Sequence, residues 1–263
     1  MDSSAEGNSA CAQQQPKIEI QNSHNEKLVG LLHETGSREV VVLCHGFKSD
    51  KNNTILKNVA AALEKEGISA FRFDFSGNGE SEGGFNYGNY KYEADDLRSV
   101  IQHFSNTNRI VTTIIGHSRG GNVVLLYASK YGNIRNAISI SGRYDLKKGI
   151  RLGDGYFERI KEQGFIDAKE GKSEFRVTHA SLMERLETDM HEARLKIYKQ
   201  VRVLTVHGSG DKVVPVGDAE EFAKIIPNHK LQIVKKADHG YTKHQTQLVS
   251  TVFNCFGVHQ DSH

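Results

Sequence analysis

The sequence predicts an α/β protein with a mostly parallel central sheet, helices on both faces of the sheet, and an inserted cap. Two observations predict the sheet: short β-branched apolar runs recur along the chain, and helical segments separate them. A third observation predicts the cap, because this alternation stops at residue 143 and resumes at Val201. Continuous apolar runs of this length are typical of parallel strands that are buried on both faces.

The expected strands begin with two short candidates, Lys17–Ile20 and Lys27–His33. The next run, EVVVLCH at Glu39–His45, is short and β-branched, as expected of a buried parallel strand. Further strands are expected at Ser69–Phe75, Arg109–Ile115, Asn136–Ser141, Val201–Gly208 and Lys230–Lys235. Strand candidates therefore lie on both sides of the interruption, which predicts a single sheet built from two parts of the chain.

Between these strands, apolar residues recur every three or four positions, which predicts helices with one buried face. In Thr54–Glu66 they are Ile55, Val59, Ala62 and Leu63, and Gly67 follows as a stop signal. The next helix has the same spacing at Leu97, Val100, Ile101 and Phe104. A helix at Gly120–Lys130 is apolar nearly all round, which indicates burial. The last two expected helices are Gly217–Ile226 and Tyr241–Cys255.

Residues 143–200, the cap segment, are charged, with scattered aromatic residues and helix candidates at Gly155–Gln163 and Leu182–Lys199. The segment is too long for an ordinary loop. We therefore expect a cap or lid, inserted into a core formed by residues 17–142 and 201–257. Residues 1–16 are rich in Ser, Ala and Gln and predict a disordered N-terminal tail, and residues 258–263 are expected to form a second tail.

Composition excludes several classes of protein. The formal charge of +2 over 263 residues gives no strong preference for nucleic acid or an anionic membrane, so neither is an expected partner. No apolar stretch approaches the roughly 20 residues that span a bilayer. Three cysteines without C-x-x-C spacing argue against a disulfide framework and favour the cytoplasm. No metal motif such as H-E-x-x-H occurs, so we expect no metal. We also expect no cofactor, and a monomer or homodimer.

Two stretches match the G-x-S-x-G pattern of nucleophilic serines, one centred on Ser118 and one on Ser81. A serine needs an adjacent base to become a nucleophile, and ligands of α/β sheets gather at the carboxyl ends of the strands. Ser118 follows an expected strand and directly precedes an expected helix, whereas Ser81 lies in a glycine-rich loop. The setting therefore favours Ser118 as the nucleophile.

An acid and a histidine follow two later strands. Asp211 comes just after the expected strand Val201–Gly208, and His239 comes shortly after the expected strand Lys230–Lys235. Both should meet Ser118 at the same edge of the sheet, which predicts a catalytic triad of Ser118, Asp211 and His239. Asp218 and Asp238 are competing acids, the first placed to begin a helix and the second adjacent to the histidine itself.

Stabilisation of a tetrahedral intermediate needs backbone N–H groups aimed at the developing oxyanion. We expect these from Arg119, the residue after the nucleophile, and from Phe47, in the turn after the first parallel strand. Cys44 is expected to be a small buried residue. The residues expected to contact substrate are His45, Phe157, Phe165, Phe175 and Met183. For the four cap residues, packing between cap helices is an equally open alternative.

Five motifs together resemble the α/β-hydrolase superfamily. They are HGF at His45–Phe47, FRFDFSGNGESEG at Phe71–Gly83, GHSRGG at Gly116–Gly121, HGSGDKVVP at His207–Pro215 and ADHGY at Ala237–Tyr241. Within the superfamily the chain is similar to serine-aminopeptidase-type (S33-like) domains, including small cinnamoyl or feruloyl esterases and their plant relatives. It departs from the usual pattern at Asn78, where the family often has another residue.

The resemblance implies a serine hydrolase of carboxylic esters, small or aromatic, acting through an acyl-enzyme. Thioesterase, monoacylglycerol lipase and aminopeptidase activities are alternatives, because the motifs specify the triad better than the substrate. A ligand receptor on a hydrolase scaffold is an alternative from a different class. For the esterase that the resemblance favours, the expected partner is a small-molecule ester.

Overall fold

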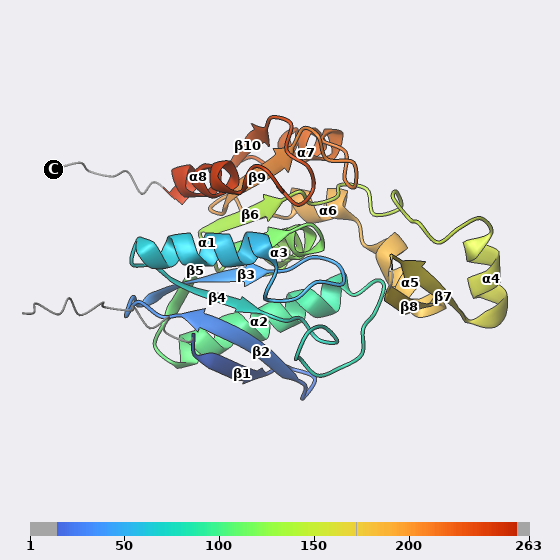
Figure 1. Cartoon of the computed structure of the whole chain (residues 1–263), viewed down its shortest axis with the longest axis horizontal. Helices are drawn as coiled ribbons and strands as arrows, with labels where there is room; N and C mark the ends of the chain where they lie inside the picture. Colours follow the sequence, from blue (N-terminus) through green and yellow to red (C-terminus); the bar gives the residue numbers. More distant parts are fainter. Residues whose placement is uncertain (1–14, 172, 257–263) are drawn as a thin grey trace, which may run out of the picture.

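The computed structural model describes residues 15–171 and 173–256 of the chain. Within these residues, one eight-stranded sheet has the order β1-β2-β4-β3-β5-β6-β9-β10 (Figure 1). Its strands are β1 (Lys17–Gln21), β2 (Lys27–His33), β3 (Glu39–Cys44), β4 (Ser69–Phe73), β5 (Ile110–His117), β6 (Asn136–Ile140), β9 (Arg202–Gly208) and β10 (His229–Val234). β1 and β2 are antiparallel to their neighbours, and β4, β3, β5, β6, β9 and β10 are parallel to one another. The predicted mostly parallel sheet is confirmed.

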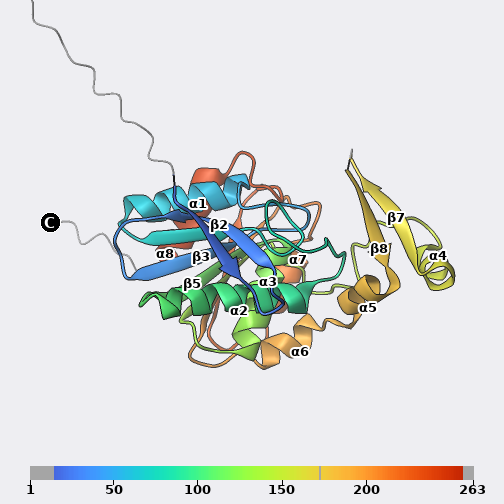
Figure 2. The same ribbon diagram turned by 90° about the horizontal axis from the view of Figure 1, so that it is seen from below.

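Helices cover both faces of the sheet, as predicted. On one face, α1 (Thr54–Lys65) and α8 (Gln245–Phe256) pack over alternate β3 residues, Val41 and Leu43. The other β3 residues, Val40, Val42 and Cys44, face the opposite core. That core is completed by α2 (Tyr90–Asn106), α3 (Arg119–Lys130), α6 (Met190–Leu195) and α7 (Gly217–Ala223). Figure 2 shows α1 and α2 on opposite sides of the sheet.

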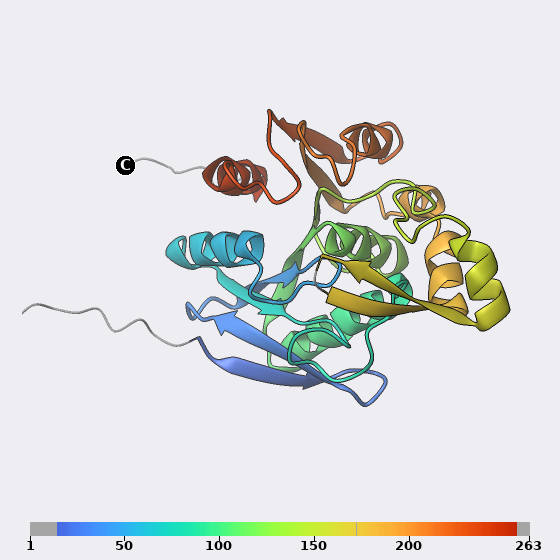
Figure 3. The ribbon, with the colours of Figure 1, turned by 45° about the vertical axis from the view of Figure 1, so that its right-hand side comes forward.

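The cap segment contains elements that periodicity did not reveal. After α4 (Tyr156–Gln163), the chain forms an antiparallel hairpin of β7 (Phe165–Glu170) and β8 (Ser173–Thr178) (Figure 3). The hairpin stands apart from the main sheet (Figure 2). The single helix expected at Leu182–Lys199 is wrong, because α5 (His179–Glu187) and α6 are separate helices. Asp189 divides them: its carboxylate accepts hydrogen bonds from the backbone N–H groups of His191 and Glu192 and so caps α6.

The two ends of the cap segment differ in what they pack against. Its α4, hairpin and α5 contribute Ile160, Ile166 and Val177 to a small apolar cluster that also includes Tyr87 and Phe47 of the core. Its last helix, α6, instead places Met190 in the main core beside α3. The parallel strands point toward the hairpin end of the molecule, so this part of the cap segment lies beyond their carboxyl ends (Figure 1).

The predicted tails fall mainly outside the described residues, since residues 1–14 and 257–263 are not among them. Two residues that the sequence assigns to the N-terminal tail are placed against the sheet instead. The carbonyl of Pro16 accepts a hydrogen bond from Leu32 N, and the Gln15 side chain accepts one from Arg72. Among the helices described, none combines the length and the apolar character needed to cross a membrane.

Candidate active site

Ser118 occupies a sharp turn between β5 and α3. Its backbone has φ +55° and ψ −118°, a conformation that costs a non-glycine residue strain energy and that recurs at functional turns. The flanking glycines make the turn possible. A Cβ on Gly116 would lie 2.0 Å from the Gly120 carbonyl oxygen, and a Cβ on Gly120 would lie 2.5 Å from the carbonyl oxygens of Cys44 and His45. The G-x-S-x-G spacing is therefore a steric requirement of this turn.

Three side chains from three strand ends meet here. The Ser118 Oγ lies 3.0 Å from His239 Nε2, and His239 Nδ1 lies 2.7 Å from Asp211 Oδ2. Because an ionised carboxylate can only accept, Nδ1 carries the proton, which leaves Nε2 to accept the Ser118 hydroxyl proton. The geometry thus brings together Ser118, His239 and Asp211 in the arrangement of a nucleophile, a base and an orienting acid.

Asp211 is held ionised. Its side chain has no exposed surface, and this burial opposes ionisation. Hydrogen bonds from His207 and His239 outweigh burial and hold the pKa of Asp211 well below its usual range. The second oxygen, Oδ1, accepts from the backbone N–H groups of Val213 and Val214, each at 2.8 Å. Both oxygens are therefore committed, which fixes the carboxylate that faces the histidine.

A second histidine supports the turn that carries His239. His117 is buried, and its Nε2 lies 2.9 Å from the backbone oxygen of His239. Burial and the neighbouring His239 lower the pKa of His117 to about 4, so its ring is neutral at physiological pH. A neutral ring that donates from Nε2 ties the end of β5 to the histidine loop. Sequence reasoning did not identify His117 or His207, although both stand inside the quoted motifs.

The two competing acids are engaged elsewhere. Asp218 lies in the first turn of α7 and accepts a hydrogen bond from Tyr144 N. Asp238 accepts from both the backbone N–H and the hydroxyl of Thr242, each at 2.7 Å. Neither carboxylate contacts His239 in the described residues, so Asp211 is the acid paired with the histidine.

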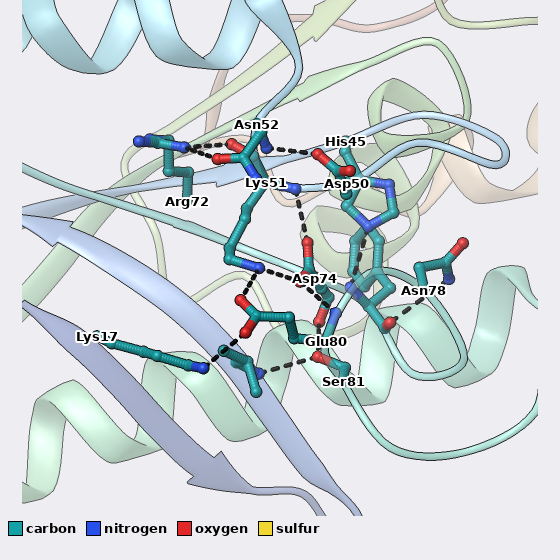
Figure 4. A network of polar contacts seen from close by, with 12 residues as sticks. Lys17, His45, Asp50, Lys51, Asn52, Arg72, Asp74, Asn78, Glu80 and Ser81 are labelled. Atoms are coloured by element: carbon teal, nitrogen blue, oxygen red, sulfur yellow. Dashed lines mark hydrogen bonds and ion pairs between the residues drawn. The ribbon is translucent and has the colours of Figure 1, made fainter. Parts of the chain in front are cut away.

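Ser81 plays a structural part in the loop after β4. Its hydroxyl donates to the Asp74 carbonyl at 2.6 Å and accepts from Val29 N at 2.9 Å (Figure 4). No histidine contacts it within the described chain. The second match to the serine pattern therefore belongs to a turn that is stabilised by this hydroxyl.

A buried ion cluster joins that loop to the turn that carries Phe47. The carboxylate of Asp74 accepts from Lys51 N at 2.6 Å and from Lys51 Nζ at 2.5 Å (Figure 4). Glu80 contacts the same ammonium group at 2.7 Å, and hydrogen bonds from Lys17 and Lys51 lower the pKa of Glu80 to about 2. Because Lys51 and Asp74 are buried, the cluster fixes the loop that begins at His45.

Two backbone donors are available beside the serine. Phe47 and Arg119 line the same cavity as Ser118, and neither of their N–H groups donates a hydrogen bond within the described part of the chain. Gly46 lies against the serine, since a Cβ there would be 3.1 Å from Ser118 Cβ. The Phe47 ring packs edge-on against Phe85, Tyr87 and Phe175 at centroid distances of 5.5, 5.8 and 5.6 Å.

The cavity at Ser118 has a volume of about 350 Å³, which suits a small ligand. Of the residues expected to contact substrate, Phe175 is on its wall. His45 is not, because it is buried, with Nε2 accepting from Phe75 N and Nδ1 donating to the Gly46 carbonyl. Burial lowers the pKa of His45 to about 4, which agrees with a neutral structural ring.

The remaining cap predictions also require correction. Phe157 and Phe165 are each 37% exposed on the outside of the cap, and the Arg176 guanidinium covers the Phe165 ring. Met183 lies on α5 and is not among the residues that line the cavity. The wall contains instead two tyrosines, Tyr87 and Tyr90, that sequence reasoning missed. Tyr87 lies in the loop after the glycine-rich stretch, which offered no periodic signal, and Tyr90 is the first residue of α2.

Cys44 is fully buried at the end of β3, as predicted, and burial raises the pKa of its thiol. A thiol of this kind is a poor nucleophile. Across the described residues, no cluster of three or more His, Cys, Asp or Glu side chains is arranged to hold a metal ion.

Comparison with known proteins places this geometry in context. A model of the serine aminopeptidase family, S33, matches residues 35–163. A monoacylglycerol lipase of Mycolicibacterium smegmatis is 28% identical over 111 residues, which are 41% of this chain and 39% of the lipase. This chain thus matches about two fifths of the length of that relative.

Two other likenesses extend over most of the chain. A Bacillus subtilis protein named "Putative esterase YitV" is 26% identical over 220 residues, 76% of this chain and 82% of that protein. The solved structure of Est1E from Butyrivibrio proteoclasticus, with bound ferulic acid, has a TM-score of 0.79 at 22% identity. It covers 91% of this chain and 97% of Est1E, so the two share their fold over nearly their full lengths.

Proposed function

We propose that this chain, which has the fold of Est1E and matches the serine aminopeptidase S33 family over residues 35–163, is a serine hydrolase that cleaves carboxylic esters. The observation that carries the proposal is the continuous hydrogen-bonded path from Ser118 through His239 to the buried Asp211, on the wall of a cavity of ligand size. An acid without exposed surface, a base and a strained serine in this order are an arrangement suited to acyl transfer.

In the proposed reaction, Ser118 Oγ attacks the ester carbonyl while His239 Nε2 takes its proton. The tetrahedral oxyanion accepts hydrogen bonds from the N–H groups of Phe47 and Arg119. His239 then returns the proton to the leaving alcohol, and an acyl-enzyme forms on Ser118. Water, deprotonated by the same histidine, releases the acid. Asp211 keeps the imidazole in the productive tautomer throughout and stabilises its charged form.

Small or aromatic esters fit the site best. Four aromatic residues line the cavity: Phe47, Tyr87, Tyr90 and Phe175. Aromatic walls favour flat apolar groups of a ligand. The likeness to Est1E, whose structure contains ferulic acid, supports the same substrate class. The likeness to a monoacylglycerol lipase makes acylglycerol esters the second candidate substrates.

The experiment that tests the proposal is labelling with a fluorophosphonate probe, followed by turnover of matched ester, thioester, monoacylglycerol and aminoacyl-amide substrates. We expect one label on Ser118 and fast multiple turnover of esters. Ser118→Ala should abolish both, whereas Ser81→Ala, the matched control in the second serine motif, should keep the label. A single slow covalent event without turnover would instead indicate a receptor, and labelling that survives Ser118→Ala would refute the assignment.

A further inference from the structure

The cavity at Ser118 is strongly cationic. Among the residues described on its wall, five carry a positive charge and none is an Asp or Glu: Arg119, Arg143, Arg151, Lys169 and Arg185. The whole chain, by contrast, has a formal charge of only +2. The positive charge on this wall is therefore a local feature of the site.

Two of the five charges are neutralised by the protein. Arg119 Nε contacts Glu93 Oε2 at 3.0 Å, and both side chains are 4% exposed. Lys169 pairs with Glu174 at 2.7 Å on the exposed hairpin. Within the described ranges, Arg143, Arg151 and Arg185 have no carboxylate within 4.0 Å. Three guanidinium groups on the wall are thus without a charged partner from the described protein.

Arg185 and Arg143 are the most enclosed of the three. Arg185 is 9% exposed, and it donates from Nε and Nη2 to the carbonyls of Leu146 and Lys148 at 2.9 and 3.0 Å. Arg143 is half-buried and donates from Nη2 to the Val213 carbonyl. Because a guanidinium has five N–H donors, each group keeps donors for a further acceptor.

The positive charges of Arg143 and Arg185 also repel each other. Burial lowers the pKa of Arg143. The charge of Asp218, which lies beyond ion-pair distance, raises this pKa, and the positive charge of Arg185 lowers it. Like charges in a partly dry cavity destabilise the protein unless an anion joins them. Backbone carbonyls satisfy hydrogen bonds but carry no net charge, so an anion remains the missing partner.

We propose that the ester hydrolysed at Ser118 carries a carboxylate, which Arg143 and Arg185 bind. The proposal rests on the ester-hydrolase function proposed above and names its substrate class. A planar guanidinium pairs with a carboxylate through two parallel hydrogen bonds, and such pairs give both affinity and orientation. Arg151, which is exposed at the rim, adds to the field that attracts the anion.

The test compares isosteric ester pairs that differ by one charge. For an acyl-side carboxylate, the pair is mono-4-nitrophenyl adipate and its ω-amide, 4-nitrophenyl adipamate. For an alcohol-side carboxylate, the pair is 4-carboxyphenyl butyrate and 4-carbamoylphenyl butyrate. Each kcat/KM is divided by the rate of spontaneous hydrolysis, and the ratio of acid to amide is the readout. We expect a ratio of at least about ten in one pair, because a charged hydrogen bond exceeds a neutral one by about that factor.

Variants assign the effect to residues. Arg143→Gln and Arg185→Gln should each lower the acid-to-amide ratio at least threefold, and the double variant should bring it close to one. Arg176→Gln is the matched control, since it removes one charge from the cap at a guanidinium that pairs with the exposed Asp167. It should leave the ratio unchanged. Rising NaCl should lower the ratio in the wild type by screening the charges.

The possible outcomes separate the two proposals. The carboxylate inference would be overturned if the acid and amide substrates of both pairs had equal kcat/KM, or if a high acid-to-amide ratio persisted in both arginine variants. Either result would leave the esterase proposal standing. The wild-type comparison decides this even if a variant fails to fold. An absence of turnover with every substrate, together with an unlabelled Ser118, would overturn the esterase and with it the inference.

Discussion

Replacing Asp211 by Asn is the sharpest test of the triad, because the structure dictates how an amide must sit there. Oδ1 of Asp211 accepts from the N–H groups of Val213 and Val214, so the amide oxygen of Asn must take that place. Its NH₂ group then faces His239 Nδ1, which lies 2.7 Å from the present Oδ2. An NH₂ group can only donate, and the histidine must respond by moving its proton to Nε2.

A proton on His239 Nε2 removes the acceptor for the Ser118 hydroxyl, 3.0 Å away. The variant therefore loses its base and the ion that stabilises the imidazolium. We expect kcat for a 4-nitrophenyl ester to fall about 10⁴-fold, which is about 5 kcal/mol of transition-state stabilisation. The free energy of unfolding should change by only about 1 kcal/mol, because both backbone donors keep their acceptor.

The assay is steady-state turnover together with urea unfolding of the same preparation. Asp218→Asn and Asp238→Asn are matched controls, since each replaces an acid that does not contact His239 and should keep at least half of the wild-type kcat. The reasoning is refuted if Asp211→Asn keeps more than a tenth of the wild-type kcat, or if either control loses as much as Asp211→Asn.

Three other substitutions have defined outcomes. Gly120→Ala puts a Cβ 2.5 Å from the Cys44 carbonyl, so turnover should fall at least about 100-fold, measured beside the folded content by circular dichroism. Asp74→Ala leaves the buried Lys51 ammonium without its nearest carboxylate and should cost about 3–5 kcal/mol in urea unfolding. Burial and, to a smaller extent, the charge of Arg194 lower the pKa of His229 from 6.5 to about 4. As the pH falls, the unfolded chain therefore takes up a proton at His229 before the folded chain does. Wild-type stability should therefore drop by about 3 kcal/mol relative to His229→Gln between pH 7 and pH 4, and parallel unfolding curves would contradict this.

The fold and the meeting of Ser118, Asp211 and His239 could be predicted because one geometric rule connects them. Parallel strands present their carboxyl ends at the same edge, so residues that directly follow different strands come together. Each strand here is a short apolar run between polar segments, so its end can be predicted from the sequence to within about two residues. The meeting of these three side chains depends only on where the strands end.

The cap could not be predicted in the same way. In the hairpin, apolar residues alternate with charged ones and face a small apolar cluster; they are Ile166, Ala168, Phe175 and Val177. This period-2 pattern is short and weak, and from the sequence we expect no element between the two cap helices. Aromatic character makes Phe157 and Phe165 candidates for the pocket, yet both side chains are partly exposed on the cap and do not line the cavity. Arg143 and Arg185 reach the cavity through packing between distant segments, which no local pattern encodes.

The Phe47 side chain gives the molecule a property that its layered architecture would not suggest. Phe47 lines the cavity at Ser118, and its ring packs against Tyr87 and against Phe175 of the hairpin. The cap is therefore not a detachable module, because a change in the hairpin that repacks Phe175 should also shift the Phe47 peptide, the proposed oxyanion donor. Under the proposed function, substrate range and reaction rate would therefore change together. Exchange of the cap between relatives should succeed only when residue 47 and its aromatic neighbours are exchanged as one unit.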